Sequence, residues 1–288
     1  MFTETDLDLG RGRTVHVYAS GPASGSGSAG AGGPTVFWHH GTPQTGEPPE
    51  PMLAVGRRHG VRWVGLDRPG YGTSTPVPGR DVAAVAADVA RVADVLGVGR
   101  FTVLGASGGG PHALACAALL GERVLAAACL ASLAPYDADG LDWFAGMAAS
   151  GVAELRAAVQ GRAVLADYLA TAEFDPEVFT PADHAALADD WSWLGGSAER
   201  AMSGGLGGMV DDDVAVTRPW GFDPGTATAP ILLVHGDEDR MVPFSHSRWL
   251  ARHCPTAELL RSPGDGHITV HRRCEQAIAW LAGHAKTA

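Results

Sequence analysis

Short apolar runs recur along the chain and are separated by longer amphipathic segments. An early run, residues 14–18, alternates apolar and polar positions and predicts an antiparallel strand. Most of the later runs are nearly continuous in apolar residues, as is typical of strands buried on both faces of a parallel sheet. These later runs are residues 35–39, 61–66, 101–104, 124–130, 231–234 and a shorter one at 257–260.

Segments rich in helix-forming residues alternate with these runs. We expect helices at residues 51–59, 81–96, 111–120, 244–252 and 270–281. A repeated order of strand and helix implies right-handed crossovers, with helices covering both faces of one sheet. The pattern therefore predicts an α/β fold with a mostly parallel central sheet flanked by helices.

The alternation is interrupted twice. Residues 21–33 are almost all Gly, Ala and Ser, which predicts a loop between two early strands. Residues 136–226 contain no clear strand. Helical patterns within this second stretch cover residues 141–149, 152–169 and 181–192, and the glycine-rich residues 203–208 follow them.

The long interruption predicts an insertion into the core. We expect the core to be built from residues 1–135 and 227–288, with residues 136–226 forming a helical lid. Half of the eight tryptophans lie in this segment, as expected for a lid over a site; an ordinary helical subdomain with packed aromatics is the alternative. The four are Trp143, Trp191, Trp193 and Trp220.

Composition and charge exclude several classes of function. The 288 residues are 45% hydrophobic, enough for one large domain with a sizeable core. The formal net charge of −11 argues against nucleic acid or an anionic membrane as the main partner, because both require concentrated Lys and Arg. Beyond that, the charge indicates little more than a soluble protein. The partner we expect is a small-molecule substrate, with no nucleic acid and no membrane.

The cysteines and the apolar segments bear on the compartment. The four cysteines have neither metal-type nor disulfide-type spacing, and we expect buried reduced thiols. The first residues are acidic and resemble no signal peptide, and the longest apolar run is too short to span a bilayer. These features favour the cytoplasm.

Residues 105–109 form the pattern Gly-x-Ser-x-Gly between a predicted strand and a predicted helix. In this context a sharp turn lifts the hydroxyl of Ser107 clear of the sheet and makes it a candidate nucleophile. Because the chain contains 39 glycines, a glycine-rich turn or a phosphate-cradling loop is the alternative interpretation.

A serine nucleophile needs a base, and the base needs an acid to orient it. Asp239 and His267 each follow a predicted strand, and the order Ser107, Asp239, His267 is that of one class of catalytic triad. The carboxyl ends of parallel strands meet at one edge of a sheet, where such residues converge. The alternatives are Asp237 or Asp137 as the acid and His271 as the base. Asp237 and His271 lie close in sequence to Asp239 and His267, and Asp137 follows the predicted strand at residues 124–130.

An oxyanion hole needs two fixed N–H donors. Gly108, the residue after the serine, offers one, and Thr42 in the loop after the strand at residues 35–39 offers the other. Within this loop we expect His40 to be an anchor whose imidazole bonds to the backbone.

Five segments together resemble the α/β-hydrolase fold superfamily, in its lidded branch of serine hydrolases and esterases. The resemblance runs from residue 39 to residue 267 in the order found in that family and does not extend to the insertion. The five segments are residues 40–43, 67–74, 105–111, 236–243 and 264–267.

The resemblance implies Asp239 rather than Asp237 as the acid and His267 as the base. Neither a metal-ligand set nor a phosphate or dinucleotide fingerprint is present in the sequence, so we expect no cofactor and no metal. The expected reaction is cleavage of a carboxylic ester, or a related acyl bond, of a small to medium, largely apolar substrate. We expect substrate contacts from His39, Trp143, Met147, Trp191 and Trp193.

Other functions on the same triad stay open. They are a carbon–carbon bond hydrolase, an aminopeptidase or amidase, a thioesterase or lactonase, an acyltransferase, and a non-catalytic ligand-binding protein. An aminopeptidase needs carboxylates to hold the substrate amine, and the lid offers several candidates. These are Glu173, Asp175, Asp189 and Asp190.

Overall fold

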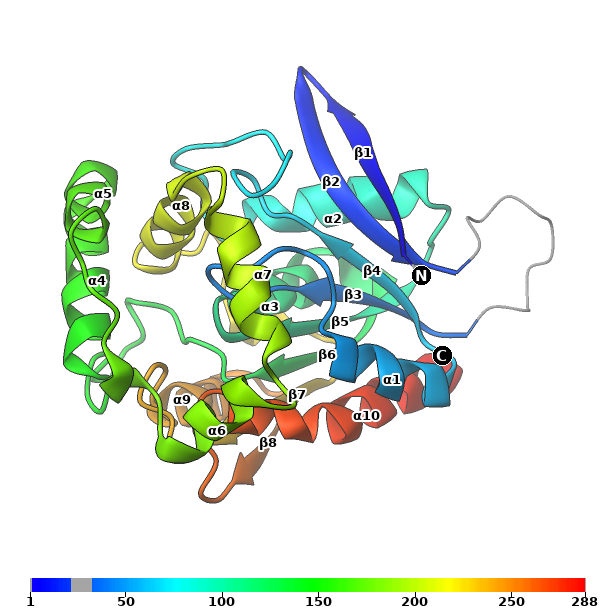
Figure 1. Cartoon of the computed structure of the whole chain (residues 1–288). Helices are drawn as coiled ribbons and strands as arrows, with labels where there is room; N and C mark the ends of the chain where they lie inside the picture. Colours follow the sequence, from blue (N-terminus) through cyan, green and yellow to red (C-terminus); the bar gives the residue numbers. More distant parts are fainter. Residues whose placement is uncertain (1, 22–32, 288) are drawn as a thin grey trace.

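An eight-stranded sheet, with strands in the order β1-β2-β4-β3-β5-β6-β7-β8, forms the centre of the computed structural model, which describes residues 2–21 and 33–287 (Figure 1). The strands β1 and β2 pair antiparallel, as do β2 and β4, whereas all other pairs are parallel. Their bounds are β1 Phe2–Gly10, β2 Arg13–Ser20, β3 Thr35–His39, β4 Arg62–Leu66, β5 Phe101–Ala106, β6 Val124–Leu130, β7 Ile231–Gly236 and β8 Ala257–Ser262.

The architecture confirms the predicted α/β fold, and every strand predicted from an apolar run is present. The edge strand β1 was not predicted. Four consecutive residues of it, 3–6, are exposed, and only a few apolar side chains such as Leu7 and Leu9 pack on the core. An acidic strand with so little burial carries almost no apolar signal. The predicted loop at residues 21–33 lies almost wholly outside the described residues.

Helices cover both faces of the sheet because successive side chains of each strand point to opposite sides. Val36 and Trp38 of β3 belong to the core shared with α1 and α10, whereas Phe37 belongs to the core shared with α2, α3 and α9. In the part of the chain that the structure describes, no helix is both long enough and apolar enough to cross a membrane. The bounds are α1 Glu50–His59, α2 Ala84–Val95, α3 Gly110–Leu119, α9 Ser245–His253 and α10 Cys274–Thr287.

The segment between β6 and β7 is helical, as predicted, and its helices gather at one end of the sheet (Figure 1). We call residues 136–226 the inserted segment. Its helices are α4 Ala149–Gln160, α5 Arg162–Leu169, α6 Pro181–Ala188, α7 Trp193–Met202 and α8 Gly207–Val216.

The details of the inserted segment differ from the prediction. The helix expected at 141–149 is a series of turns that ends where α4 begins. The single helix expected at 152–169 is divided at Gly161, whose φ of 118° is open to glycine but strained for other residues. The helix α8 was not predicted, because its consecutive acidic residues at 211–213 look solvent-facing in the sequence but are buried.

Candidate active site

Ser107 lies at a sharp turn between β5 and α3. Its backbone φ is +52°, a value that residues other than glycine rarely adopt. Glycine is required on both sides of it. A Cβ at Gly105 would lie 2.4 Å from the carbonyl oxygen of Gly109, and a Cβ at Gly109 would lie 2.0 Å from that of His39. The close approach of strand, turn and helix therefore explains the Gly-x-Ser-x-Gly pattern in physical terms.

The structure brings Ser107, His267 and Asp239 together in one chain of hydrogen bonds. Nδ1 of His267 lies 2.7 Å from Oδ2 of Asp239, and Nε2 of the same ring lies 3.0 Å from the hydroxyl oxygen of Ser107. A carboxylate can only accept, so Nδ1 donates to Asp239 and Nε2 is left to accept from the serine. The three residues follow β5, β8 and β7, so they converge at the carboxyl ends of parallel strands.

The charges and hydrogen bonds around Asp239 and His267 lower the pKa of the carboxyl and raise the pKa of the imidazole. Burial alone would raise the pKa of Asp239, but the charge of His267 and hydrogen bonds from His235 and His267 outweigh burial and lower it. The backbone N–H groups of Met241 and Val242 also donate to Asp239, at 2.9 and 2.8 Å. Burial would lower the pKa of His267, but the charge and the hydrogen bond of Asp239 raise it above its usual value.

The alternative acids and base do not join this chain of hydrogen bonds. Asp237 pairs with Arg261 and accepts from the backbone N–H of Gly264 at 2.7 Å. Asp137 lines a separate surface groove. His271 bonds through Nδ1 to the carbonyl oxygen of His267 at 3.1 Å, and its burial lowers its pKa to about 4.

The loop after β3 lies against the residue that follows Ser107. A Cβ placed on Gly108 would be 2.4 Å from Oγ1 of Thr42 and 3.5 Å from the backbone nitrogen of Thr42. Thr42 and Gly108 line the same cavity as Ser107. The predicted pair of N–H donors is therefore adjacent in space, on two separate segments of chain.

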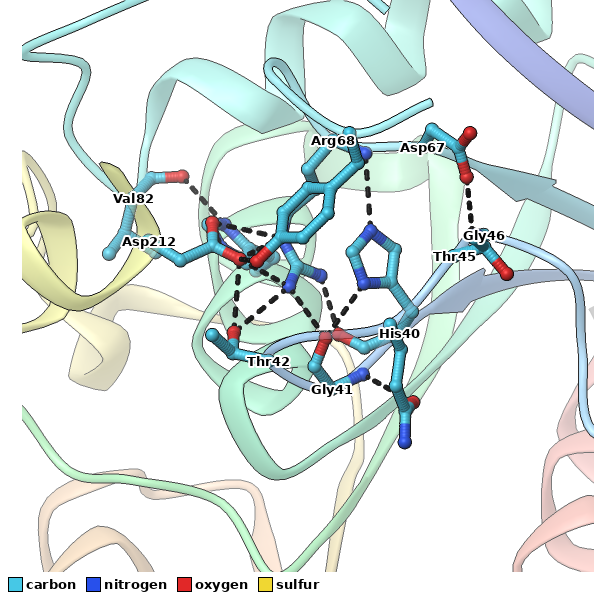
Figure 2. A network of polar contacts seen from close by, with 12 residues as sticks. His40, Gly41, Thr42, Thr45, Gly46, Asp67, Arg68, Val82 and Asp212 are labelled. Atoms are coloured by element: carbon cyan, nitrogen blue, oxygen red, sulfur yellow. Dashed lines mark hydrogen bonds and ion pairs between the residues drawn. The ribbon is translucent and has the colours of Figure 1, made fainter. Parts of the chain in front are cut away.

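A buried guanidinium holds this loop in place (Figure 2). Arg68 donates to the carbonyl oxygens of His40 and Gly41 at 2.5 and 3.0 Å, and to Oγ1 of Thr42 at 3.2 Å. Nδ1 of His40 donates to the carbonyl oxygen of Gly41 at 2.7 Å, and its Nε2 accepts the backbone N–H of Arg68. The prediction that His40 anchors the loop through the backbone is confirmed.

One carboxylate from the inserted segment completes the network (Figure 2). Asp212 on α8 pairs with Arg68 at 2.6 Å and with Arg80 at 2.5 Å, and accepts hydrogen bonds from Tyr71 at 2.8 Å and Thr42 at 3.0 Å. All of these side chains except that of Thr42 are buried, and the two guanidinium charges outnumber the one carboxylate. The loop beside Ser107 is therefore fixed by α8, an element about 170 residues away in sequence.

A second carboxylate of the inserted segment fixes the loop that carries His267. Oδ1 of Asp183 on α6 accepts from the backbone N–H groups of Ile268 and Thr269, at 3.0 and 2.8 Å. The negative charge of Asp183 also contributes to the raised pKa of His267. Asp183 was not predicted from the sequence. Its only local signal is the capping box that it forms with Thr180 at the start of α6.

A cavity of about 520 Å³ opens over Ser107 and His267. Its floor contains Thr42 and Gly108, and its walls come largely from the inserted segment. Apolar side chains line most of it, with Glu154 and Asp213 among the polar exceptions. Representative apolar contributors are Leu155, Phe174, Phe179, Leu194, Met202 and Met209.

The structure corrects the substrate contacts that we expected from the sequence. Among the described residues, the lining of this cavity includes none of His39, Trp143, Met147, Trp191 and Trp193. These side chains pack the inserted segment, or the sheet, from behind the cavity wall.

Individual contacts show why the tryptophans are turned away. Nε1 of Trp143 donates to the carbonyl oxygen of Ala134 at 2.9 Å, and its ring packs edge-on against His246. The ring of Trp191 packs against His271, with ring centroids 5.1 Å apart.

The other three residues are also engaged elsewhere. Trp193 stacks beneath the guanidinium of Arg200 at 5.5 Å, and Met147 is buried in the core shared with α9. His39 is fully buried, with Nε2 3.6 Å from the sulfur of Cys116. The aromatic content of the segment indicated an apolar interior, but it did not show which side of the wall each ring occupies.

Comparison with known proteins bears on the fold of the chain. The profile of the family described as alpha/beta hydrolase fold matches residues 34–272, which is more than half of the chain. A bifunctional esterase/perhydrolase of Acinetobacter calcoaceticus is 35% identical over 104 residues, which are 35% of this chain and 38% of that protein. The chain therefore matches well under two thirds of that relative's length.

Solved structures resemble the whole chain at low identity. A thermophilic esterase from Thermogutta terrifontis superposes with a TM-score of 0.70 and 20% identity, over 98% of this chain and 99% of its own. An enol-lactonase from Burkholderia xenovorans gives 0.69 and 18%, over 96% and 98%. A bromoperoxidase from Bacillus anthracis gives 0.72 and 19%, over 98% and 100%. At these identities the likeness shows a shared fold.

Proposed function

The chain belongs to the α/β-hydrolase fold family, and on that premise we propose that it is a serine hydrolase. Its proposed reaction is the cleavage of a carboxylic ester, or a related acyl bond, in a small to medium, largely apolar substrate. The observation that carries the proposal is the unbroken chain from Asp239 through His267 to the hydroxyl of Ser107, at the floor of a cavity with mostly apolar walls.

In this mechanism Ser107 attacks the substrate carbonyl carbon while Nε2 of His267 takes the hydroxyl proton. Asp239 holds the imidazole in the tautomer that can accept at Nε2 and stabilises the imidazolium that forms. His267 then gives its proton to the leaving group. Water cleaves the acyl-enzyme by the same route, with His267 again as the base.

The backbone N–H groups of Thr42 and Gly108 are the proposed donors to the oxyanion. Their adjacency across the loop and the turn supports this role, as does the rigid support of the loop by Arg68. A preorganised donor pair is effective because it needs no rearrangement when the negative charge develops. Behind the loop, the two positive charges of Arg68 and Arg80 exceed the one negative charge of Asp212. This excess positive charge also stabilises the negative charge of the oxyanion.

The inserted segment is the proposed lid. Its helices supply most of the cavity wall, and its carboxylates Asp183 and Asp212 hold the loops that carry His267 and Thr42. The relatives include an esterase, an esterase/perhydrolase and an enol-lactonase, and these names support chemistry at an ester carbonyl.

A substrate panel tests this function. Matched esters, amides, thioesters and lactones with acyl chains of two to eight carbons are offered to the wild type and to Ser107→Ala. We expect turnover of esters by the wild type, with turnover by the variant reduced by about 10⁴-fold or more. Turnover of amides or thioesters in preference to esters would overturn the ester assignment. Equal activity in the variant would overturn the mechanism.

A further inference from the structure

Two carboxyl groups from different helices of the inserted segment meet in the wall of the cavity. Glu154 on α4 and Asp213 on α8 both line it, together with Ser107 and His267. Asp213 is only 6% exposed, and its side chain lies within hydrogen-bond distance of the side chain of Glu154. When both carboxyls are ionised, Oδ2 of Asp213 has no donor among the described residues. An acceptor buried in this way is costly unless a donor reaches it.

The two groups affect each other's protonation. Burial raises the pKa of Asp213 well above its usual value, and the negative charges of Glu154 and Asp212 raise it further. Burial also raises the pKa of Glu154. Two close carboxyls in a cavity wall cannot both be ionised cheaply, so with no cation beside them they retain a proton between them.

The positive charges nearby are engaged elsewhere. Arg68 and Arg80 pair with Asp212, and Arg162 pairs with Asp211 at 2.8 Å. Arg240 also lines the cavity, but it is half exposed and lies 3.7 Å from Glu177. These cations therefore leave the pair of Glu154 and Asp213 without a counter-charge.

Two of the four acidic residues expected from the sequence to hold an amine line the cavity, and two do not. Glu173 and Asp175 are the lining residues, but Glu173 is exposed and Asp175 accepts the backbone N–H of Glu177 at 2.9 Å. Asp189 is exposed and does not line the cavity, and Asp190 pairs with Arg272 at 3.1 Å. The structure instead brings together half-buried Glu154 and buried Asp213, which are 59 residues apart in the sequence.

We propose that Glu154 and Asp213 bind an ammonium group of the substrate, within the same cavity as Ser107. The inference rests on the proposed function, because it names the class of acyl substrate that the site takes. An ammonium ion brings three N–H donors and one positive charge, so it can take the place of the proton shared by the two carboxyl groups. The apolar walls then contact the aliphatic part of an amine-bearing ester or amide.

A binding measurement tests the pair without any turnover. Calorimetry compares n-hexylammonium with 1-hexanol on Ser107→Ala, on Ser107→Ala with Asp213→Asn, and on Ser107→Ala with Glu154→Gln. We expect the ammonium to bind about 10- to 100-fold more tightly than the alcohol, and either carboxyl substitution to remove most of that difference. If one carboxyl variant does not fold, the other answers the question.

A kinetic measurement links the pair to the reaction. The ratio of kcat/KM for methyl 6-aminohexanoate to that for methyl heptanoate is measured within each variant, so that the neutral ester is the internal reference. We expect a ratio of about 10 or more in the wild type and a ratio near 1 in Asp213→Asn and Glu154→Gln. Asp189→Asn removes a similar charge outside the cavity and should keep the wild-type ratio.

The outcomes separate this inference from the proposed function. Turnover of the neutral ester that depends on Ser107, without tighter binding of hexylammonium, would overturn the inference and leave the serine hydrolase standing. Tighter binding of 1-hexanol than of hexylammonium would show a protonated pair acting as a donor, and would also overturn it. Absence of turnover with carboxyl-dependent ammonium binding would support the site and count against the hydrolase.

Discussion

Asp212 accepts a hydrogen bond of 3.0 Å from the hydroxyl of Thr42 and so joins the inserted segment to the loop beside Ser107. The same carboxylate pairs with both Arg68 and Arg80, which lie with it in the interior. One carboxylate on α8 therefore both positions this loop and supplies the counter-charge for the two guanidinium groups beneath it.

Replacing Asp212 by Asn should be strongly destabilising. The substitution leaves two buried guanidinium groups without a counter-charge, and breaking a buried ion pair from one side typically costs about 3–5 kcal/mol. We expect the free energy of unfolding in guanidinium chloride to fall by about that amount.

The neighbouring residue on the same helix provides a matched control. Asp211 pairs with Arg162, whose side chain is half exposed, so Asp211→Asn should cost much less, about 1 kcal/mol. Similar losses for the two variants would show that the charge balance around Asp212 is not what stabilises the loop.

The pH dependence of activity follows from the raised pKa of His267. The base must be neutral to accept the proton of Ser107, so kcat/KM should fall as the pH drops through the pKa of His267. Because the charge and hydrogen bond of Asp239 outweigh burial and raise this pKa, the fall should begin above the usual value for histidine, which is about 6.5.

The variant Asp239→Asn tests the cause of that shift. Removing the carboxylate should move the acidic limb of the kcat/KM profile to lower pH and reduce kcat by about 10⁴-fold, because the amide favours the wrong imidazole tautomer. An unchanged limb in the variant would mean that another group titrates.

Asp183 should act as a positioning residue for the loop that carries His267. In Asp183→Ala the buried N–H groups of Ile268 and Thr269 lose their acceptor, and we expect a loss of about 2–4 kcal/mol in stability. We also expect a fall in kcat of about 10-fold with KM nearly constant, because the imidazole is displaced rather than the substrate.

The conservative variant separates position from charge. Asp183→Asn keeps an oxygen that can accept both N–H groups, and it should restore most of kcat while lowering the pH at which the acidic limb appears. A kcat in Asp183→Asn as low as that of Asp183→Ala would show that the hydrogen bonds are not the essential contribution.

The backbone at Ser107 should carry measurable strain. Its φ of 52° costs a residue with a Cβ about 1–2 kcal/mol, whereas glycine adopts it freely but loses more conformational entropy on folding. We therefore expect Ser107→Gly to be more stable to denaturant than Ser107→Ala by about 0.5–1 kcal/mol. The opposite order would indicate that the turn is relaxed in solution.

The sheet could be predicted from the sequence because its central strands are buried on both faces and read as apolar runs. The convergence of Ser107, Asp239 and His267 could also be predicted, because each follows a strand and parallel strands end at one edge. The strand β1 was missed because an edge strand with acidic, exposed positions has no such signal.

The walls of the cavity could not be predicted, because they depend on contacts between distant segments. The rings of Trp143 and Trp191 anchor the inserted segment instead of lining the cavity. The three acidic residues at 211–213 have three different environments, and only the fold decides which two pair with cations and which one faces the cavity.

Covalent labelling by a fluorophosphonate, followed by peptide mass spectrometry, tests the central claim most directly. The hydroxyl of Ser107 should be activated by His267 and Asp239, so the adduct should map to Ser107 and labelling should be abolished in His267→Ala. An adduct on another residue, or no adduct on a folded protein whose cavity admits the probe, would contradict the account.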